Sequence, residues 1–394
     1  MLKAIIFDMD GVLVDSELVH FEATSQMLNE LFQIEIEYDY YKQYIGGTVE
    51  NLWKGIISDF NIGGENVTSI NLKADKYLEE MISESGYPEV SGVVRFVKYL
   101  HEKTDLMLAV ASSSSMEKIK RNIKKMGLED CFHILVSGAD IGKSKPAPDV
   151  FLMAADKLGI DCHECMVIED SENGVMAAAN AKMPCLGFIN PHSGDQNLSR
   201  ASALFEDFDN LDLNYIKLIY GHSVGEPVTV ITTDRLIIRE ICEKDVDKLY
   251  EIYKDKEVTK YMPDLFANIE DELEYTRQYI KKVYHFYLYG MWIVELKSTG
   301  EIIGRAGIDV IEKDGDIACE LGYLIAKQYQ GLGYATEATL AVIEYARKYL
   351  DVEKLFVEID RENIPSMKIA RKIGVNFTGK KNQKGYEEGW LTLN

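Results

Sequence analysis

The sequence predicts an α/β protein in which an open parallel sheet with a helical insert is followed by a second unit of α+β type. Two observations predict the first part: short apolar runs alternate with helical patterns, and a helix-rich stretch interrupts this alternation after the first run. A third observation predicts the second part, since strand-like residues of alternating polarity begin soon after residue 228. The length of 394 residues suits two or three domains of about 150 residues each.

Each element of the first part has a basis in the sequence. Apolar runs that end in polar residues predict buried strands at residues 4–7, 106–111, 134–136 and 166–168. Helical patterns, two of them stopped by glycine, predict helices at 93–102, 116–126 and 149–158. Residues 16–88 break the rhythm and predict an insert with helices at 20–32, 38–44, 49–59 and 72–83.

The second part begins after a predicted linker. A last helix of the first part is expected at 213–220, and residues 221–227, Gly-His-Ser-Val-Gly-Glu-Pro, have the composition of a linker. Beyond it we expect strands at 236–239, 302–310, 319–325 and 355–359, a helix near Asp245 and a long helix at 336–349. The predicted division is a core of 1–15 and 89–220, an insert of 16–88, a linker of 221–227 and a second unit of 228–394.

Composition excludes two classes of partner. The net charge is −22, with 19 Lys and Arg against 36 Asp and Glu in residues 1–227, and 24 against 29 in the rest. Such a surface repels nucleic acid, whose binding needs clustered basic residues. No apolar run approaches the ~18 residues that a membrane span requires, so no membrane partner is expected. The six cysteines are scattered, which predicts a reduced, cytoplasmic protein.

Polar side chains follow each of the four predicted strands of the first part. In chain order they are Asp8 and Asp10, then Ser112, then Lys145, then Glu169 and Asp170. Because ligands bind beyond the carboxyl ends of strands in an open α/β sheet, we expect these groups to converge there.

This combination of groups predicts phosphate chemistry. Converging carboxylates favour a hard divalent cation such as Mg²⁺, and Lys145 and Ser112 would bind the anionic oxygens of a phosphate beside it. A carboxylate nucleophile splits phosphoryl transfer into two easier steps, and Asp8 would have this role. Asp10, two residues further on, would protonate the leaving oxygen and later deprotonate the attacking water.

Four such motifs in this order resemble the haloacid dehalogenase (HAD) superfamily, in its β-phosphoglucomutase-like phosphatase branch. The resemblance extends to about residue 213. It implies a Rossmann-like core, with Mg²⁺ held by Asp8, the backbone carbonyl of Asp10 and Asp170, and with Glu169 supporting the site. It also implies that residues 16–88 form the helical cap that closes over the substrate.

The same resemblance bears on the substrate, a small phosphate monoester of sugar phosphate type. Substrate-binding positions are expected at Ser113, at His20 and at Thr48. Sugar-phosphate mutases of this branch use a cap arginine for a second phosphate, but residues 45–49 read Ile-Gly-Gly-Thr-Val. A phosphatase is therefore favoured, and a mutase is the alternative.

The second unit contains a glycine-rich loop between a predicted strand and a helix. It reads Gln328-Tyr-Gln-Gly-Leu-Gly-Tyr-Ala335, and glycines here let backbone N–H groups turn toward an anion such as a pyrophosphate. Together with Glu320-Leu-Gly-Tyr323 and Thr233-Asp-Arg-Leu-Ile-Ile-Arg239, the loop resembles the GNAT acetyltransferases, most nearly the type that acetylates N-terminal amines of ribosomal proteins. The resemblance implies acetyl-CoA binding by two groups of residues. They are Gln328, Gly331, Gly333, Tyr334 and Ala335 for the pyrophosphate, and Asn363 and Ser366 for the pantetheine arm.

Acetyl transfer also needs an amine acceptor, a base and a proton donor. Glu320 is the candidate base. Many relatives have a tyrosine proton donor where this chain has Ala370, so the donor stays unassigned, with Ser366 a weak substitute. The alternative is a non-catalytic unit that senses acetyl-CoA. Cys162-His-Glu-Cys165 has a metal-like spacing, but no second Cys or His pair follows it, and we do not predict a zinc site there.

Overall fold

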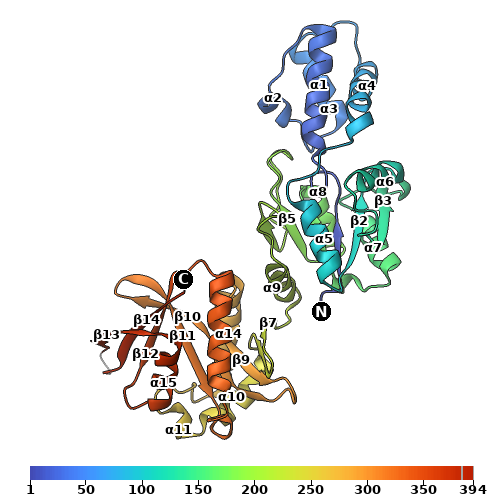
Figure 1. Cartoon of the computed structure of the whole chain (residues 1–394). Helices are drawn as coiled ribbons and strands as arrows, with labels where there is room; N and C mark the ends of the chain where they lie inside the picture. The colour runs from blue at the N-terminus through green and yellow to red at the C-terminus, as the bar shows by residue number, and fades with distance from the viewer. Residues whose placement is uncertain (383–384, 394) are drawn as a thin grey trace. The chain divides into compact units, whose positions relative to one another are not determined.

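The computed structural model describes residues 1–382 and 385–393. The chain divides into two compact units, Met1–Val224 and Gly225–Asn394. The first contains a parallel sheet with helices and the second a mixed sheet with helices (Figure 1). The predicted α/β fold class, with an α+β second unit, is confirmed.

The first sheet has six parallel strands in the order β3-β2-β1-β4-β5-β6. They are β1 (Ala4–Phe7), β2 (Met107–Ser112), β3 (Ile134–Ser137), β4 (Cys165–Glu169), β5 (Cys185–Phe188) and β6 (Ala203–Phe205). The central strand β1 is buried on both faces, as its unbroken apolar run predicts. Ala4 and Ile6 join a core on one face, whereas the ring of Phe7 contacts Phe96 across the other.

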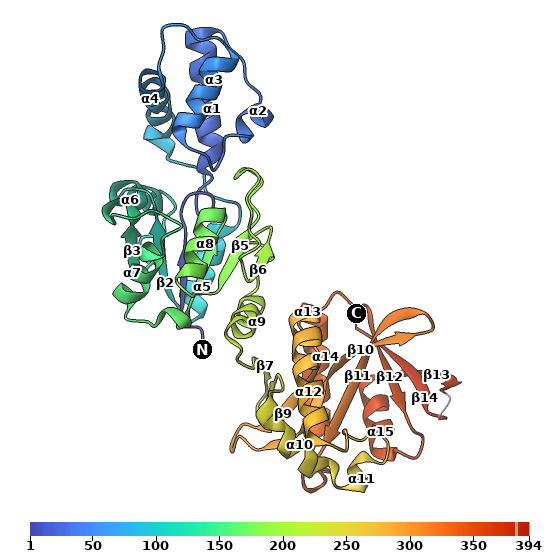
Figure 2. The same cartoon turned by 180° about the vertical axis from the view of Figure 1, so that it is seen from behind.

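Helices cover both faces of this sheet. They are α5 (Val93–Lys103), α6 (Met116–Lys125), α7 (Asp149–Leu158), α8 (Glu172–Asn180) and α9 (Leu213–Val224). Helices α7 and α8 lie on the face opposite α5, which the views from front and back both show (Figures 1 and 2). The sequence did not predict β5, β6 or α8.

The insert is a helical cap with its own hydrophobic core. Its helices are α1 (Ser16–Phe32), α2 (Tyr38–Lys42), α3 (Val49–Asp59) and α4 (Val67–Ser85). The core is built around the buried Trp53 and includes Met27, Ile56 and Ile70. Helix α4 begins earlier than predicted because Asn66 and Ser69 form a reciprocal capping box.

The end of the first unit differs from the prediction. The predicted linker began at Gly221, but α9 continues through Gly221 to Val224. Gly221 is buried within the helix, and the Ser223 hydroxyl donates to the carbonyl of Ile219 in the preceding turn. Gly225 follows with a φ of +71°, a conformation that ends helices.

The second unit contains an eight-stranded sheet in the order β13-β14-β12-β11-β10-β9-β8-β7. Its strands are β7 (Thr229–Thr232), β8 (Leu236–Arg239), β9 (Met291–Leu296), β10 (Ile302–Lys313), β11 (Asp316–Ile325), β12 (Lys354–Ile359), β13 (Asn376–Lys381) and β14 (Glu387–Thr392). Neighbours pair antiparallel, except that β11 and β12 run parallel. The parallel pair meets at one register position, Glu320 opposite Phe356.

Helices of the second unit accompany this sheet. They are α10 (Val246–Tyr253), α11 (Lys256–Thr259), α12 (Ile269–Tyr279), α13 (His285–Tyr287), α14 (Tyr334–Tyr349) and α15 (Ile364–Ile373). The buried face of α14, including Val342 and Ala346, packs with strand residues in one core. Over the described ranges of the whole chain, no helix combines the length and the apolar character that crossing a membrane would demand.

Candidate active sites

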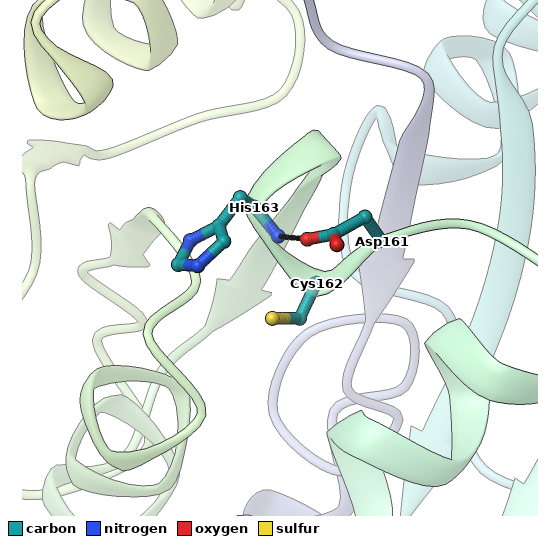
Figure 3. Close-up of side chains that lie close together, drawn as sticks. All are labelled: Asp161, Cys162 and His163. Carbon is teal, nitrogen blue, oxygen red and sulfur yellow. Dashed lines mark hydrogen bonds between the residues drawn. The ribbon is translucent and has the colours of Figure 1, made fainter.

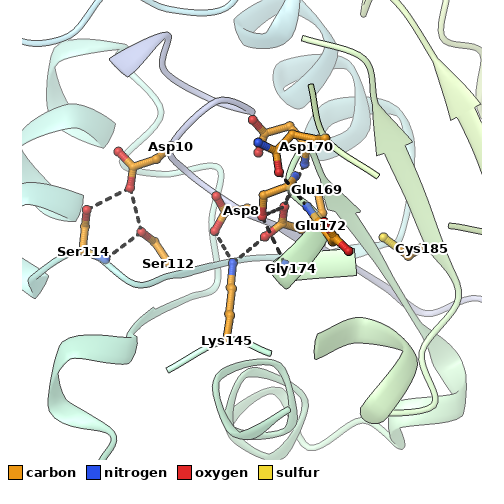
Figure 4. A network of polar contacts seen from close by, with 12 residues as sticks. Asp8, Asp10, Ser112, Ser114, Lys145, Glu169, Asp170, Glu172, Gly174 and Cys185 are labelled. Carbon is orange, nitrogen blue, oxygen red and sulfur yellow. Dashed lines mark hydrogen bonds and ion pairs between the residues drawn. The ribbon is translucent and has the colours of Figure 1, made fainter. Parts of the chain in front are cut away.

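Carboxylates and a lysine meet at the carboxyl edge of the first sheet. Asp8 follows β1, Glu169 ends β4, and Lys145 lies in the loop before α7. The Lys145 ammonium lies 2.5 Å from Asp8 Oδ1 and 2.7 Å from Glu169 Oε1 (Figure 4). The side chains of Lys145 and Asp8 are each 8% exposed and that of Glu169 is 1% exposed, so both ion pairs are shielded from water.

This cluster carries more negative charge than its lysine balances. Oxygens of Asp8, Glu169 and Asp170 all lie within 4.8 Å of one another. Burial, opposed by Lys145 and reinforced by Glu169, raises the pKa of Asp8 to about 7. Burial and the charge of Glu169 also raise the pKa of Asp170. Three buried carboxylates with oxygen donors around one ammonium fit a hard divalent cation such as Mg²⁺.

The two neighbouring acids at the end of β4 are held in place by backbone and hydroxyl groups. Glu169 Oε2 accepts hydrogen bonds from the amides of Asp170 and Ser171, each 2.8 Å long, and from the Ser171 hydroxyl. A Cβ on Gly174 would lie 1.6 Å from Glu169 Oε1, so only glycine fits there. Gly11 has a φ of +83°, and a Cβ on it would lie 1.9 Å from Asp170 Oδ2.

Asp10 and Ser112 form a second group beside this cluster. Asp10 Oδ2 accepts from the hydroxyls of Ser112 at 3.2 Å and Ser114 at 2.9 Å, and Ser112 Oγ accepts from the Ser114 amide. Figure 4 shows the Asp10 side chain turned toward these serines. The structure therefore separates the Asp10 carboxylate from the metal-like cluster. The sequence did not predict the contact of Ser114 with Asp10, because a run of four serines after a strand does not indicate which hydroxyl points toward the site.

A loop after β5 supplies contacts that the sequence did not predict. The Asn190 amide donates to the Gly11 carbonyl at 2.8 Å, and the Ser193 hydroxyl donates to Asp170 Oδ2. The Tyr38 hydroxyl of the cap donates to the His192 carbonyl at 2.7 Å. The loop thus contacts the cap and one of the clustered carboxylates. Its polar composition was a signal, but β5 itself was not recognised.

The predicted substrate-binding residues are divided by the structure. His20 and Thr48 line one cavity in the cap, with a volume of about 210 Å³. His20 Nε2 lies 3.3 Å from the Tyr87 hydroxyl, whereas Thr48 Oγ caps α3 by accepting from the Asn51 amide. Ser113 is exposed on the core and does not line this cavity.

In the second unit, the glycine-rich loop leads directly into α14. Gly331 and Gly333 have φ angles of +77° and +85°, which other residues adopt at a cost. Gly333 is the residue before the first turn of the helix, so Tyr334 and Ala335 open it, and Gln328 lies in a short 3₁₀ turn just before the loop. The loop therefore precedes the positive end of a 16-residue helix.

Arg235 braces this loop, a role that the sequence did not reveal. Its guanidinium lies 4.3 Å from the ring centre of Tyr334 and 2.6 Å from Glu337 Oε2. It also donates to the Leu332 carbonyl at 3.1 Å. These contacts fix the first turn of α14 against the strand that begins at Leu236.

The remaining predicted residues lie on β11, where Glu320 pairs with Phe356 of β12, and at the start of α15. Asn363 Oδ1 accepts from the Ser366 amide and so caps α15. Ser366 also faces the side chain of Tyr323, whose pKa is raised by burial. Glu320 itself lies on β11, and burial together with the charges of Glu358 and Asp309 raises its pKa to about 7. A half-buried carboxyl of this kind suits a base near neutral pH.

Asp161, Cys162 and His163 also gather at one point of the first unit. They lie at the short 3₁₀ turn before β4, where Asp161 Oδ1 accepts from the His163 amide at 2.8 Å (Figure 3). This hydrogen bond caps the turn and gives Asp161 a local structural role.

Two protein families match separate parts of the chain. The model of the haloacid dehalogenase-like hydrolases matches residues 5–188. The model of the acetyltransferase (GNAT) domain matches residues 235–376. The first match contains the Lys145 cluster and the cap, and the second contains the glycine-rich loop.

Curated relatives divide in the same way. YhcW of Bacillus subtilis, whose name assigns it provisionally to the phosphatases, is 30% identical over 215 residues, which are 53% of this chain and 90% of that protein. The β-phosphoglucomutase of Bacillus subtilis is 28% identical over 194 residues, 47% of this chain and 83% of that one. An uncharacterized N-acetyltransferase of Bacillus licheniformis, p20, is 30% identical over 152 residues, which are 37% of this chain and 82% of that protein.

Proposed function

Because the chain belongs to the haloacid dehalogenase-like hydrolases through its first unit and to the GNAT acetyltransferases through its second, we propose a magnesium-dependent phosphatase joined to an acetyl-CoA-dependent N-acetyltransferase. The observation that carries the first activity is the buried cluster of Asp8, Glu169 and Asp170 around Lys145. The free thiols of all six cysteines support a place in the reducing cytoplasm.

In the proposed hydrolysis, an oxygen of Asp8 attacks phosphorus while the bond to the leaving oxygen breaks. Asp10 gives its proton to that oxygen, so the alcohol leaves neutral and Asp8 carries the phosphoryl group. Water then attacks phosphorus, Asp10 takes back a proton, and phosphate leaves Asp8. Lys145, already 2.5 Å from Asp8, pairs with the anionic oxygens throughout.

Asp8, Asp170 and the carbonyl of Asp10 would hold Mg²⁺, with Glu169 supporting them. The ion supplies positive charge that offsets the charge of the phosphoryl oxygens. Ser193 keeps Asp170 directed toward the cluster through its hydrogen bond. Ser112 and Ser114 hold the Asp10 carboxyl in one direction next to the cluster, from which it would have to reach the leaving oxygen of a bound substrate.

We favour a phosphatase over a mutase because of the cap. Residues 45–49 line the cap cavity, and this stretch has no arginine to hold a second phosphate. The similarity to a β-phosphoglucomutase keeps a sugar phosphate as the substrate class and a mutase as the alternative. The test is an assay with hexose 1-phosphate. Release of phosphate supports the proposal, and conversion to the 6-phosphate without release contradicts it.

For acetyl transfer, the glycine-rich loop would bind the pyrophosphate of acetyl-CoA at the start of α14. Glu320 would accept the proton of the acceptor amine. Tyr323, which faces Ser366 and has a phenol O–H to give, would supply the proton that the sequence left unassigned. The acetyl group moves from sulfur to nitrogen, and the thiolate leaves with the proton of Tyr323.

The alternative for the second unit is binding without turnover. Calorimetry with acetyl-CoA measures binding, and thiol release with a panel of amines measures transfer. Thiol release that depends on an added amine supports the enzyme. Binding without thiol release over the whole panel supports a sensor.

A further inference from the structure

The cap cavity has an unusual charge for a site beside phosphate chemistry. Its lining includes the carboxyl groups of Glu17 and Asp75 and the imidazole of His20. Other polar groups of the lining are hydroxyls and amides, including Tyr41 and Asn71, and no lysine or arginine of the described chain is part of it. A second phosphate of a substrate would therefore find acids and no permanent cation in this cavity.

The cavity lies close to the proposed reaction centre. Glu17 is in the first turn of α1, which begins at Ser16, six residues after Asp10 in the chain. The negative charge of Asp10 acts on both Glu17 and His20. A small substrate whose phosphate is at Asp8 would thus place its leaving group at this end of the cavity.

Glu17 has no cationic partner in the described part of the chain. Burial and the charges of Asp10 and Asp15 raise its pKa to about 7, and its carboxyl has no hydrogen bond or ion pair with any residue that the structure describes. Asp75 is held in place by the Asn71 amide at 2.9 Å, and Asn71 in turn accepts from the Trp53 indole. A cation bound between Glu17 and Asp75 would therefore meet a carboxylate of fixed position, that of Asp75.

The other charged groups around the cavity do not neutralise it. Burial lowers the pKa of His20 below its ordinary value of 6.5, against the charges of Asp10 and Asp75, so the ring is not a permanent cation. Lys118 belongs to α6 and is not part of the lining, and Arg121 of the same helix faces Glu79 of the cap at 3.6 Å. The cavity itself therefore has a negative balance.

We propose that the cap cavity binds a cationic amine on the leaving group, so that the substrate is a small amino-alcohol or amino-sugar phosphate. The inference rests on the proposed phosphatase and names its substrate class. Hydrolysis would release an alcohol that still carries its amine, and a primary amine is the acceptor group that an N-acetyltransferase consumes. In the second unit the carboxylates of Asp309 and Glu358 near Glu320 would attract the same cation, opposed by the charge of Lys313. The two activities would then act in sequence on one compound.

The test compares esters that differ only in the amine. Phosphate release is measured with Mg²⁺ for 2-aminoethyl phosphate against 2-hydroxyethyl phosphate, and for glucosamine 6-phosphate against glucose 6-phosphate. We expect kcat/KM to be about 10-fold higher for the amine of at least one pair, as one ionic contact provides. p-Nitrophenyl phosphate, which has neither group, reports whether the phosphatase itself works.

Variants assign the preference to the cavity. Glu17→Gln and Asp75→Asn should each bring the amine-to-hydroxyl ratio toward 1, whereas Glu22→Gln, on the exposed side of α1, should leave it unchanged. A wild-type ratio near or below 1 in both pairs, with p-nitrophenyl phosphate hydrolysed, overturns the inference and leaves the phosphatase standing. A ratio that survives both substitutions also overturns it. No release from any ester contradicts the phosphatase itself.

Discussion

Replacing Lys145 by methionine removes the only ammonium paired with the carboxylate cluster among the described residues, while keeping the length of the side chain. Asp8 and Glu169 are then left buried without their ion pairs, which are 2.5 and 2.7 Å long in the wild type. Breaking a buried pair by removing one partner costs roughly 3–5 kcal/mol. For a unit of this size each kcal/mol lowers the melting temperature by about 2–4 °C, so without metal a loss of roughly 10 °C is expected.

The assay is calorimetry of the full-length protein, with the transition of the first unit identified as the one that Mg²⁺ shifts. Mg²⁺ should recover part of the loss, because it supplies the missing positive charge. The control is Lys143→Met, two residues away, since Lys143 is 73% exposed and lies 3.9 Å from Asp149. An exposed pair of this kind contributes less than about 1 kcal/mol. Equal melting temperatures for the two variants would refute the reasoning.

Three further predictions concern single residues. Ser193→Ala should weaken Mg²⁺ binding about 10-fold by calorimetry, because Asp170 loses its hydrogen-bond donor, and unchanged affinity would show that the serine does not position it. Gly331→Ala should weaken acetyl-CoA binding several-fold, because a φ of +77° costs an L-residue roughly 1–2 kcal/mol. The added Cβ would have no atom within 4 Å, so the effect would come from the backbone conformation alone. Equal binding by wild type and variant would show that the loop does not need this conformation. For Glu320, the folded-state pKa of about 7 is above its ordinary value of 4.5, so the protonated form stabilises the fold at low pH and this contribution is lost as pH rises toward and through 7. Glu320→Gln should therefore remove that loss of stability between pH 4.5 and 8, and should also remove the rise of the acetylation rate through pH 7. Identical pH profiles for wild type and variant would contradict both.

Much of the first unit could be predicted because its elements have strong local signals. The run Ala4–Phe7 is apolar throughout and becomes the central strand, and α3 has the predicted bounds because Thr48 caps its first turn. The short strand β5 includes Gly187 among its four residues, and no turn signal marked it in the sequence. Without β5, the loop that brings Ser193 to Asp170 could not be placed.

Side-chain directions at the sites depended on contacts between distant segments. The sequence grouped Asp10 with the other acids, but hydrogen bonds from Ser112 and Ser114, over 100 residues away, turn its carboxyl to one side. The brace of Arg235 on the loop before α14 likewise joins segments about 100 residues apart. Local patterns predicted both families and the residues of both candidate sites, and tertiary contacts decided how each side chain is directed.

The most direct test of the central claim is phosphate release from a panel of small phosphate monoesters with Mg²⁺, for the wild type and for Asp8→Asn. Asparagine has nearly the same shape as aspartate but cannot act as the nucleophile, so the fold should be kept and turnover lost. The account predicts hydrolysis by the wild type that EDTA abolishes, none by Asp8→Asn, and equal acetyl transfer by both. Hydrolysis by Asp8→Asn at the wild-type rate would contradict it.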